Sequence, residues 1–357
     1  MARFDEAATC FIRPARLSSG PMLPLRFVPS HRCDEVPNVV VDGSANRSTR
    51  LTLSHWPGSP TPVEVRDDLS AQIAFHALST PFLFDGIDVV TNNHFDQDGL
   101  CSVYSLVDPD NASARRALVI DVASAGDFGT FASRDAARIA FALAASEDED
   151  ISPLDPAVFA GSYPEQCGRL YEAMLPRFTD LLDHPDRSRA LWEREDAHLQ
   201  ASLDAIAKGI VAVDEHRHLD LAVVTVPPDW AERSTHRFTQ SREDAVHPMA
   251  VNQSTSCLRL ALLQGQRYRV ECRYETWVML TSRRVLPRPD LRDLVPRLNE
   301  IEPGGAAWRA DAPGSLTPRL ELADASGESG LSPEQFVSEL TSFLATAPAA
   351  WDPFNPT

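Results

Sequence analysis

Short apolar runs alternate with helically spaced stretches over the first 160 residues, and this order limits the possible folds more than any other feature. The predicted strands are residues 38–42, 51–53, 87–91 and 117–121. Helical spacing follows over about 100–107 and 133–145, with Ser133 as a typical N-cap. The fold class is therefore α/β, a parallel sheet with flanking helices and with functional side chains at the carboxyl ends of the strands.

The residue pattern divides the whole chain into four parts. We expect an extended N-terminal arm, an α/β domain, a helical spacer and a β-rich α+β C-terminal lobe, over residues 1–35, 36–160, 161–209 and 210–357. Within the last part, residues 257–286 are predicted to form adjacent antiparallel strands that face the first domain.

Two segments have the form of a capping box, which marks the start of a helix. Thr61-Pro62-Val63-Glu64 predicts a helix that begins near residue 62, and Ser332-Pro333-Glu334-Gln335 predicts the last helix of the chain. The second helix has one apolar face and should pack on the core.

The composition excludes several classes of protein. A net charge of −18 argues against stable binding of duplex nucleic acid, which requires clustered cations. The six cysteines show no CxxC pair, which favours a reducing compartment over a disulfide framework. No signal-like segment or run of about 18 apolar residues is found, so we expect a cytoplasmic protein without a membrane span.

An acidic turn follows the strand at 87–91. His94, Asp96 and Asp98 alternate along it, so their side chains should fall on one side. Two close carboxylates repel each other unless a cation lies between them, and this ligand type suits Mn²⁺, Mg²⁺ or Fe²⁺. Gly99 would let the chain turn into a helix whose N-terminus could receive an anion, for which phosphate is the natural candidate.

Other interpretations of this turn remain open. Asp96 and Asp98 could simply cap the following helix while His94 packs. A calcium loop is a further alternative, although Ser105 stands where its bidentate Glu belongs. Asp121 and Asp127 follow the predicted strand 117–121 and are expected at the same edge of the sheet, as further metal ligands.

Asn93-His94-Phe95-Asp96-Gln97-Asp98-Gly99-Leu100-Cys101-Ser102 resembles the first motif, His-x-Asp-x-Asp-Gly-x-x-Ser, of the DHH phosphoesterases. The resemblance implies that His94, Asp96 and Asp98 bind metal and that Asp121 bridges two Mn²⁺ ions. No Asp-His-His triplet supplies the third motif of that superfamily, and no glycine-rich GGGH-like signature is present. The nearest triplet, Asp214-Glu215-His216, precedes a strand and is interpreted as an exposed turn.

Several further residues are candidates for substrate binding. His55 ends a predicted strand and could line the cleft, or it could belong to a packed aromatic turn with Trp56. His247 and Asn252 lie in an irregular segment that could reach the cleft from the second lobe.

Arginines on or beside the predicted strands of the second lobe complete the set. Arg273, Arg283 and Arg284 should point inward, because an Arg fork matches phosphate in a bidentate manner. Buried ion pairs with local glutamates are the alternative for these three residues.

The residues together predict a metal-dependent phosphoesterase or pyrophosphatase-like hydrolase. Its substrate would be a small phosphorylated compound or short nucleotide, with Mn²⁺ or Mg²⁺ as the cofactor. The alternative is a non-catalytic binding or interaction protein that a metal ion stabilises.

Overall fold

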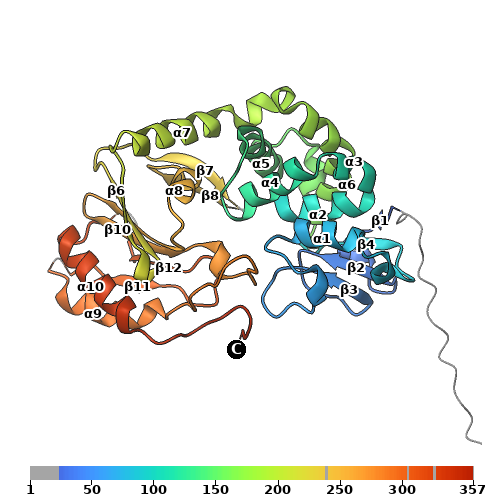
Figure 1. Ribbon diagram of the computed structural model, residues 1–357. Helices are drawn as coiled ribbons and strands as arrows, with labels where there is room; N and C mark the ends of the chain where they lie inside the picture. Colours follow the sequence, from blue (N-terminus) through green and yellow to red (C-terminus); the bar gives the residue numbers. More distant parts are fainter. Residues whose placement is uncertain (1–23, 238–239, 304, 325–326, 357) are drawn as a thin grey trace, which may run out of the picture.

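In the computed structural model, which describes residues 24–237, 240–303, 305–324 and 327–356, the N-terminal apolar runs form one parallel sheet (Figure 1). Its order is β1-β4-β2-β3, and every neighbouring pair is parallel. The strands are β1 (Arg26–Phe27), β2 (Asn38–Val41), β3 (Thr49–Leu53) and β4 (Val89–Thr91). The predicted α/β class with a parallel sheet is confirmed. The predicted N-terminal arm falls partly outside the described residues, and its described end contains β1.

Seven helices of the described chain accompany or follow this sheet. They are α1 (Ser70–Leu78), α2 (Gln97–Val107), α3 (Pro109–Ala114), α4 (Arg116–Asp127), α5 (Arg134–Glu147), α6 (Tyr163–Asp183) and α7 (Arg189–Ala207). Helices α1, α2, α4 and α5 pack on one another in chain order, above the strands in Figure 1. Their buried faces and the sheet share one hydrophobic core, which α6 joins through Leu170, Tyr171 and Phe178.

Two predictions for this part are wrong. Residues 117–121 belong to helix α4, in which Val119, Val122 and Ala123 are buried at helical spacing, and not to a strand. A short apolar run fits either element, and only the continuation to Asp127 shows the helical period. The helix predicted near residue 62 is a single 3-10 turn over Val63–Val65, and α1 begins later, at Ser70.

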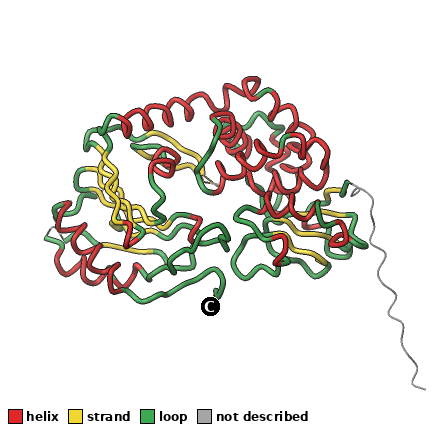
Figure 2. The backbone as a smooth tube through the Cα atoms, viewed as in Figure 1, coloured by secondary structure: helices red, strands yellow, loops and turns green. Residues whose placement is uncertain are grey.

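A mixed sheet of six strands forms the C-terminal lobe, residues 212–356 (Figure 2). Its order is β11-β12-β10-β9-β6-β5, and only β6 and β9 are parallel. The strands are β5 (Ala212–His216), β6 (Leu221–Val226), β9 (Arg259–Gln264), β10 (Arg267–Cys272), β11 (Trp308–Ala310) and β12 (Arg319–Leu322). A separate hairpin joins β7 (Arg233–Arg237) to β8 (Gln240–Asp244), and the helices are α8 (Pro248–Ser254), α9 (Val295–Ile301) and α10 (Pro333–Thr346).

The predictions for this lobe are right in part. Ser332 caps α10 through the predicted capping box, and β9 pairs antiparallel with β10 as expected. Residues 277–286 form no strand, because this segment leaves the sheet after β10 and contacts the N-terminal lobe. The triplet 214–216 lies in β5 and is not a turn.

Helix α7 runs along both lobes, as Figure 1 shows. Trp192 and Leu199 lie in the core of the N-terminal lobe (residues 24–183), whereas Ala205 packs in a cluster with β6. Met249 of α8 and Val278 also enter the N-terminal core, so the two lobes share buried apolar contacts. Among the described residues, no helix has the length and apolar character needed to cross a membrane.

Candidate metal centre

The carboxyl ends of three parallel strands meet at one edge of the N-terminal sheet. Asp42 directly follows β2, His55 comes two residues after β3, and the acidic turn follows β4. Because β4, β2 and β3 are adjacent, these side chains gather although they lie up to 56 positions apart in the chain. Asp127, the last residue of α4, approaches the same place.

Four of these residues form a buried group that could hold a metal ion. The buried group consists of Asp42, His55, Asp98 and Asp127, each offering one ligand atom within 4.8 Å of the others. His55 Nε2 lies 3.4 Å from Asp42 Oδ1, 3.9 Å from Asp98 Oδ2 and 3.5 Å from Asp127 Oδ2. Atoms that share one ion at about 2.0–2.2 Å stand roughly 3–4 Å apart, so the spacing fits a common ion.

Three residues form a second group beside the first. The outer group consists of Asp42, His94 and Asp96, and Asp42 belongs to both groups. His94 Nε2 lies 3.3 Å from Asp42 Oδ2 and 3.0 Å from Asp96 Oδ2. The side chains of His94 and Asp96 are 17% and 10% exposed, whereas Asp42 is 1% exposed. The outer group therefore faces the solvent side of the centre.

Hydrogen bonds from neighbouring elements orient the ligands. Asp98 accepts from the backbone N–H groups of Ser70 and Ala71, both at 2.7 Å, at the start of α1. Ser70 Oγ donates to Asp42 Oδ1 at 2.8 Å, and Asp96 caps α2 by accepting from the Gly99 N–H. Such contacts fix carboxylates in place before any ion arrives.

The imidazole of His55 is held in a defined tautomer. Its Nδ1 lies 2.6 Å from the carbonyl oxygen of Asp68, which can only accept, so Nδ1 carries the proton. In the neutral ring, Nε2 then keeps a lone pair that points toward the three carboxylates of the buried group. This arrangement is typical of a metal-binding histidine.

Among the buried side-chain atoms of the centre that make no hydrogen bond within the described part of the chain are Asp42 Oδ2 and His55 Nε2. Buried polar atoms are nearly always hydrogen-bonded, so an unsatisfied pair at the contact point of two ligand groups indicates an additional species. A metal cation would satisfy both atoms and balance the neighbouring negative charge.

The charges of the centre depend strongly on one another. Burial and then the nearby charge of Asp42 raise the pKa of Asp98 to about 7. Burial also opposes ionisation of Asp42, but His55 and His94 outweigh it and lower the Asp42 pKa far below its usual range. The pKa of His94 is raised well above its usual value, because Asp96 and Asp42 together outweigh burial.

The structure brings some of the predicted metal ligands together. His94, Asp96, Asp98 and Asp127 lie in the two groups, as does His55, which was expected to touch substrate. Asp121 does not join them: its carboxylate accepts from the N–H groups of Ala132 and Ser133 in front of α5. The predicted strand that would have carried Asp121 to the sheet edge is helical.

The predicted substrate residues of the second lobe occupy different environments. Arg273 is buried and pairs with Glu275, and Asn252 is buried and donates to the backbone of the N-terminal lobe. His247 is buried next to Glu195 and caps α8. The prediction that all three arginines point inward is wrong for Arg283 and Arg284, which are exposed because their segment forms no strand.

Sequence reasoning missed Asp42, the residue common to both groups. The signal was present: Val39-Val40-Val41 is an apolar run that ends in Asp42-Gly43, the pattern sought after every parallel strand. It also missed Tyr274 and Trp277, which pack near His55 and Trp56 from the other lobe.

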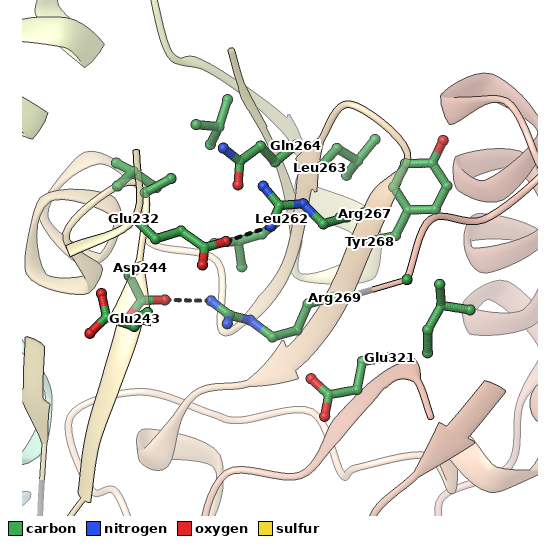
Figure 3. A pocket seen from close by; sticks show the side chains of 15 residues that line it. Glu232, Glu243, Asp244, Leu262, Leu263, Gln264, Arg267, Tyr268, Arg269 and Glu321 are labelled. Atoms are coloured by element: carbon green, nitrogen blue, oxygen red, sulfur yellow. Dashed lines mark hydrogen bonds and ion pairs between the residues drawn. The ribbon is translucent and has the colours of Figure 1, made fainter. Parts of the chain in front are cut away.

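A separate pocket of about 290 Å³ lies in the C-terminal lobe, between the β9–β10 hairpin and β8 (Figure 3). Arg269 pairs with Asp244 and Arg267 with Glu232, both at 2.8 Å, across this pocket. Its cations are thus engaged by local carboxylates, and none of the predicted site residues lines it.

A family model described as "Family of unknown function (DUF6687)" matches residues 23–355 of the chain. The searches of curated proteins and of solved structures returned no match.

Proposed function

This chain belongs to the DUF6687 family, whose function is unknown, and we propose from its Asp/His centre that it is a metal-dependent phosphoesterase or pyrophosphatase-like hydrolase. One observation carries the proposal: Asp42 lies in both ligand groups. A carboxylate shared by adjacent groups is the arrangement that brings two ions to within about 3.5–4 Å of each other, as in two-metal hydrolases.

The resemblance of residues 93–102 to the DHH phosphoesterases supports the same function. The resemblance implies an aspartate that bridges two ions, and Asp42 has the position for that role which Asp121 lacks. His55, which follows β3, supplies a further ligand of the buried group. We therefore propose a DHH-like centre in which Asp42 and His55 complete the ligands of the acidic turn.

The proposal assigns a role to each residue of the centre. Bound divalent ions in such centres activate water and stabilise charge on phosphate. Asp42, His55, Asp98 and Asp127 would hold an ion in the buried position, and Asp42, His94 and Asp96 would hold one in the outer position. Because His94 and Asp96 are partly exposed, substrate reaches the centre from their side. Trp56, whose ring centroid lies 5.0 Å from that of His94, restricts this approach.

The identity of metal and substrate follows from ligand chemistry and charge. Carboxylate and imidazole ligands without thiolates favour Mn²⁺ or Mg²⁺. A chain with a net charge of −18 repels long polyanions, so the substrate is a small phosphorylated compound or short nucleotide. The five cysteines within the described residues are buried and free, which agrees with a reducing compartment such as the cytoplasm.

A second function has one observation in its favour. The buried group is fully enclosed, and Asp98 uses both carboxylate oxygens on backbone N–H groups, as a structural centre would. The alternative is thus a non-catalytic binding protein that an ion stabilises. It predicts tight metal binding without turnover.

The first prediction concerns the shared ligand. Protein stripped with a chelator should bind two Mn²⁺ per chain, hydrolyse pyrophosphate or bis-p-nitrophenyl phosphate, and gain about 2.7 kcal/mol of stability at a hundredfold excess of Mn²⁺ over the dissociation constant. Asp42→Asn should abolish turnover and most of the Mn²⁺-dependent shift in melting temperature, because it removes a ligand charge from both groups.

Asp110→Asn is the matched control, since Asp110 is exposed on α3. It should behave like the wild type. If calorimetry detects no Mn²⁺ or Mg²⁺ binding to the wild type, the metal centre is wrong. Metal binding without any hydrolysis would favour the non-catalytic alternative.

A further inference from the structure

We infer that the C-terminal lobe positions two ligands of the buried group, so that metal binding there is coupled to docking of the two lobes. The inference rests on the proposed metal centre and adds a role for residues that bind no ion themselves. Asn252 and Arg273, expected from the sequence to touch substrate, are positioning residues in this arrangement, and Asp68 is a third.

The first contact holds the end of α4, whose last residue is Asp127. The carbonyl oxygen of the next residue, Phe128, accepts from Asn252 Nδ2 at 2.9 Å and from Arg273 Nη2 at 3.3 Å. Gly129 follows with a φ of +61°, and a Cβ there would lie 2.6 Å from Asn252 Nδ2. The chain therefore turns directly against the C-terminal lobe immediately after a ligand.

The second contact holds His55. The N–H of Met279, in the C-terminal lobe, donates to the carbonyl oxygen of His55 at 2.8 Å. The carboxylate of Asp68 accepts from the N–H groups of Thr281 and Ser282 at 2.7 and 2.9 Å. The carbonyl oxygen of Asp68 also orients the His55 ring. The C-terminal lobe therefore holds the His55 backbone directly and its ring indirectly, through Asp68.

The outer group is attached differently. Among the described residues, the hydrogen bonds found for His94 and Asp96 are made within the N-terminal lobe, with Asn92, Gly99, Leu100 and each other. Separation of the lobes would therefore disturb Asp127 and His55 first and leave the ligands specific to the outer group in place. This difference separates a positioning role from a general loss of stability.

Coupling of this kind is reciprocal. If docking of the lobes improves the geometry of the buried group, an ion in that group must favour docking by the same factor. Residues that orient metal ligands typically change metal affinity by about 10- to 100-fold when they are removed. The metal affinity of the buried group should therefore fall when docking of the two lobes is weakened.

The experiment uses Asp68→Ala in the full chain, because Asp68 is at the protein surface and its substitution leaves the carbonyl oxygen that holds His55. Mn²⁺ titrations followed by electron paramagnetic resonance should show two classes of site in the wild type. Asp68→Ala should weaken one class about tenfold or more and leave the other unchanged. Hydrogen exchange of residues 127–131 should slow on Mn²⁺ addition in the wild type and slow less in Asp68→Ala.

Asp67→Ala is the matched control, since Asp67 has its contacts within the N-terminal lobe, to the Asp68 N–H and near His76. It should retain both affinities. Asn252→Ala tests the other contact independently and should weaken the same class. The coupling would be overturned if both classes of Mn²⁺ site kept their affinity in Asp68→Ala and in Asn252→Ala. It would also be overturned if the affinity of both classes fell equally. Either result would leave the metal centre itself intact. A wild type that binds no Mn²⁺ would instead overturn the proposed function itself.

Discussion

Asp42, the residue common to both ligand groups, has an unusual backbone conformation. Its φ of 44° lies in the left-handed region, which aspartate adopts at a modest cost compared with most other side chains. The following residue, Gly43, is packed so closely that a Cβ there would lie 2.2 Å from Asn93 Oδ1. Backbone strain of this kind persists where the surrounding structure enforces it, which is common at functional sites.

Gly99 is a second residue at which the centre permits no side chain. A Cβ there would lie 2.6 Å from both Asn92 Nδ2 and the Tyr171 hydroxyl, and 3.0 Å from Asp96 Oδ1. Alanine favours helices by about 1 kcal/mol over glycine, so an open position in α2 would gain stability. Here we expect Gly99→Ala to destabilise the metal-free protein by about 1–3 kcal/mol, because overpacking outweighs propensity.

Denaturant unfolding in the presence of a chelator measures this loss. Mn²⁺ affinity should fall as well, because the Gly99 N–H donates to the outer-group ligand Asp96. An unchanged or higher free energy of unfolding in Gly99→Ala would show that the close approach is not required.

Helix α1 shows how elements far apart in the chain depend on one another. Its first two N–H groups are capped by Asp98 of α2, 28 and 27 positions away, and not by a local side chain. The capping signal at Thr61 therefore gave a wrong start for the helix, whereas the local caps Ser133 and Ser332 predicted α5 and α10 correctly. The start of a helix could therefore be predicted from the sequence where its cap is a neighbouring residue, but not where the cap comes from a distant part of the chain.

The residues of the candidate site also differ in whether they could be predicted from local sequence. His94, Asp96 and Asp98 lie on one turn, so their convergence was predictable from spacing alone. Asp42 joins them only because β2 lies beside β4, and strand order is decided by packing over the whole sheet. Asp121 was misplaced because the apolar run before it forms a helix.

Hairpin strand β7 is joined to α7 by an acid–imidazole pair that should titrate. His236 Nδ1 lies 3.2 Å from Glu195 Oε2, with Asp148 3.3 Å from the other ring nitrogen and His247 3.4 Å from Glu195. The hydrogen bond with Glu195 raises the pKa of His236 above its usual 6.5. Although burial opposes it, hydrogen bonding to His236 and His247 lowers the pKa of Glu195 below its usual 4.5.

The sign of the pH dependence follows from these directions. The contribution of His236 is fully present below about pH 6.5 and is lost as the pH rises through its raised pKa. That of Glu195 is present above about pH 4.5 and is lost as the pH falls through its lowered pKa. We expect His236→Gln to destabilise the protein by about 1 kcal/mol near pH 6 and by less near pH 9.

Melting temperatures measured with a chelator from pH 5 to 9 test this expectation. The difference between wild type and His236→Gln should shrink as the pH rises. A difference that stays constant across this range would mean that the imidazole contributes through packing and not through its charge.

At the scale of the whole molecule, residues 347–356 connect the two lobes. Figure 1 shows the chain leaving α10 and ending beside the N-terminal lobe. Trp351 pairs with the backbone of Arg288, and the guanidinium of Arg288 lies over its ring at 4.8 Å. Two residues later, the carbonyl oxygen of Pro353 accepts from the N–H of Gly58 at 3.1 Å, in the turn that follows His55 and Trp56.

The final prediction concerns this connection. In Trp351→Ala the buried Arg288 loses its aromatic partner, which is worth about 0.5–2 kcal/mol, and the segment that carries Pro353 is held less firmly. We expect a lower melting temperature and faster hydrogen exchange of the Gly58 amide, whose partner is Pro353. Phe354→Ala is the matched control, since Phe354 belongs to the same segment but is 48% exposed. Because Gly58 lies in the turn that follows His55, loosening the segment should also lower the Mn²⁺ affinity of the buried group slightly, by less than Asp68→Ala does. Gly58 exchange that is equally fast in Phe354→Ala and Trp351→Ala, or unchanged in both, would show that Trp351 does not secure the contact between the lobes.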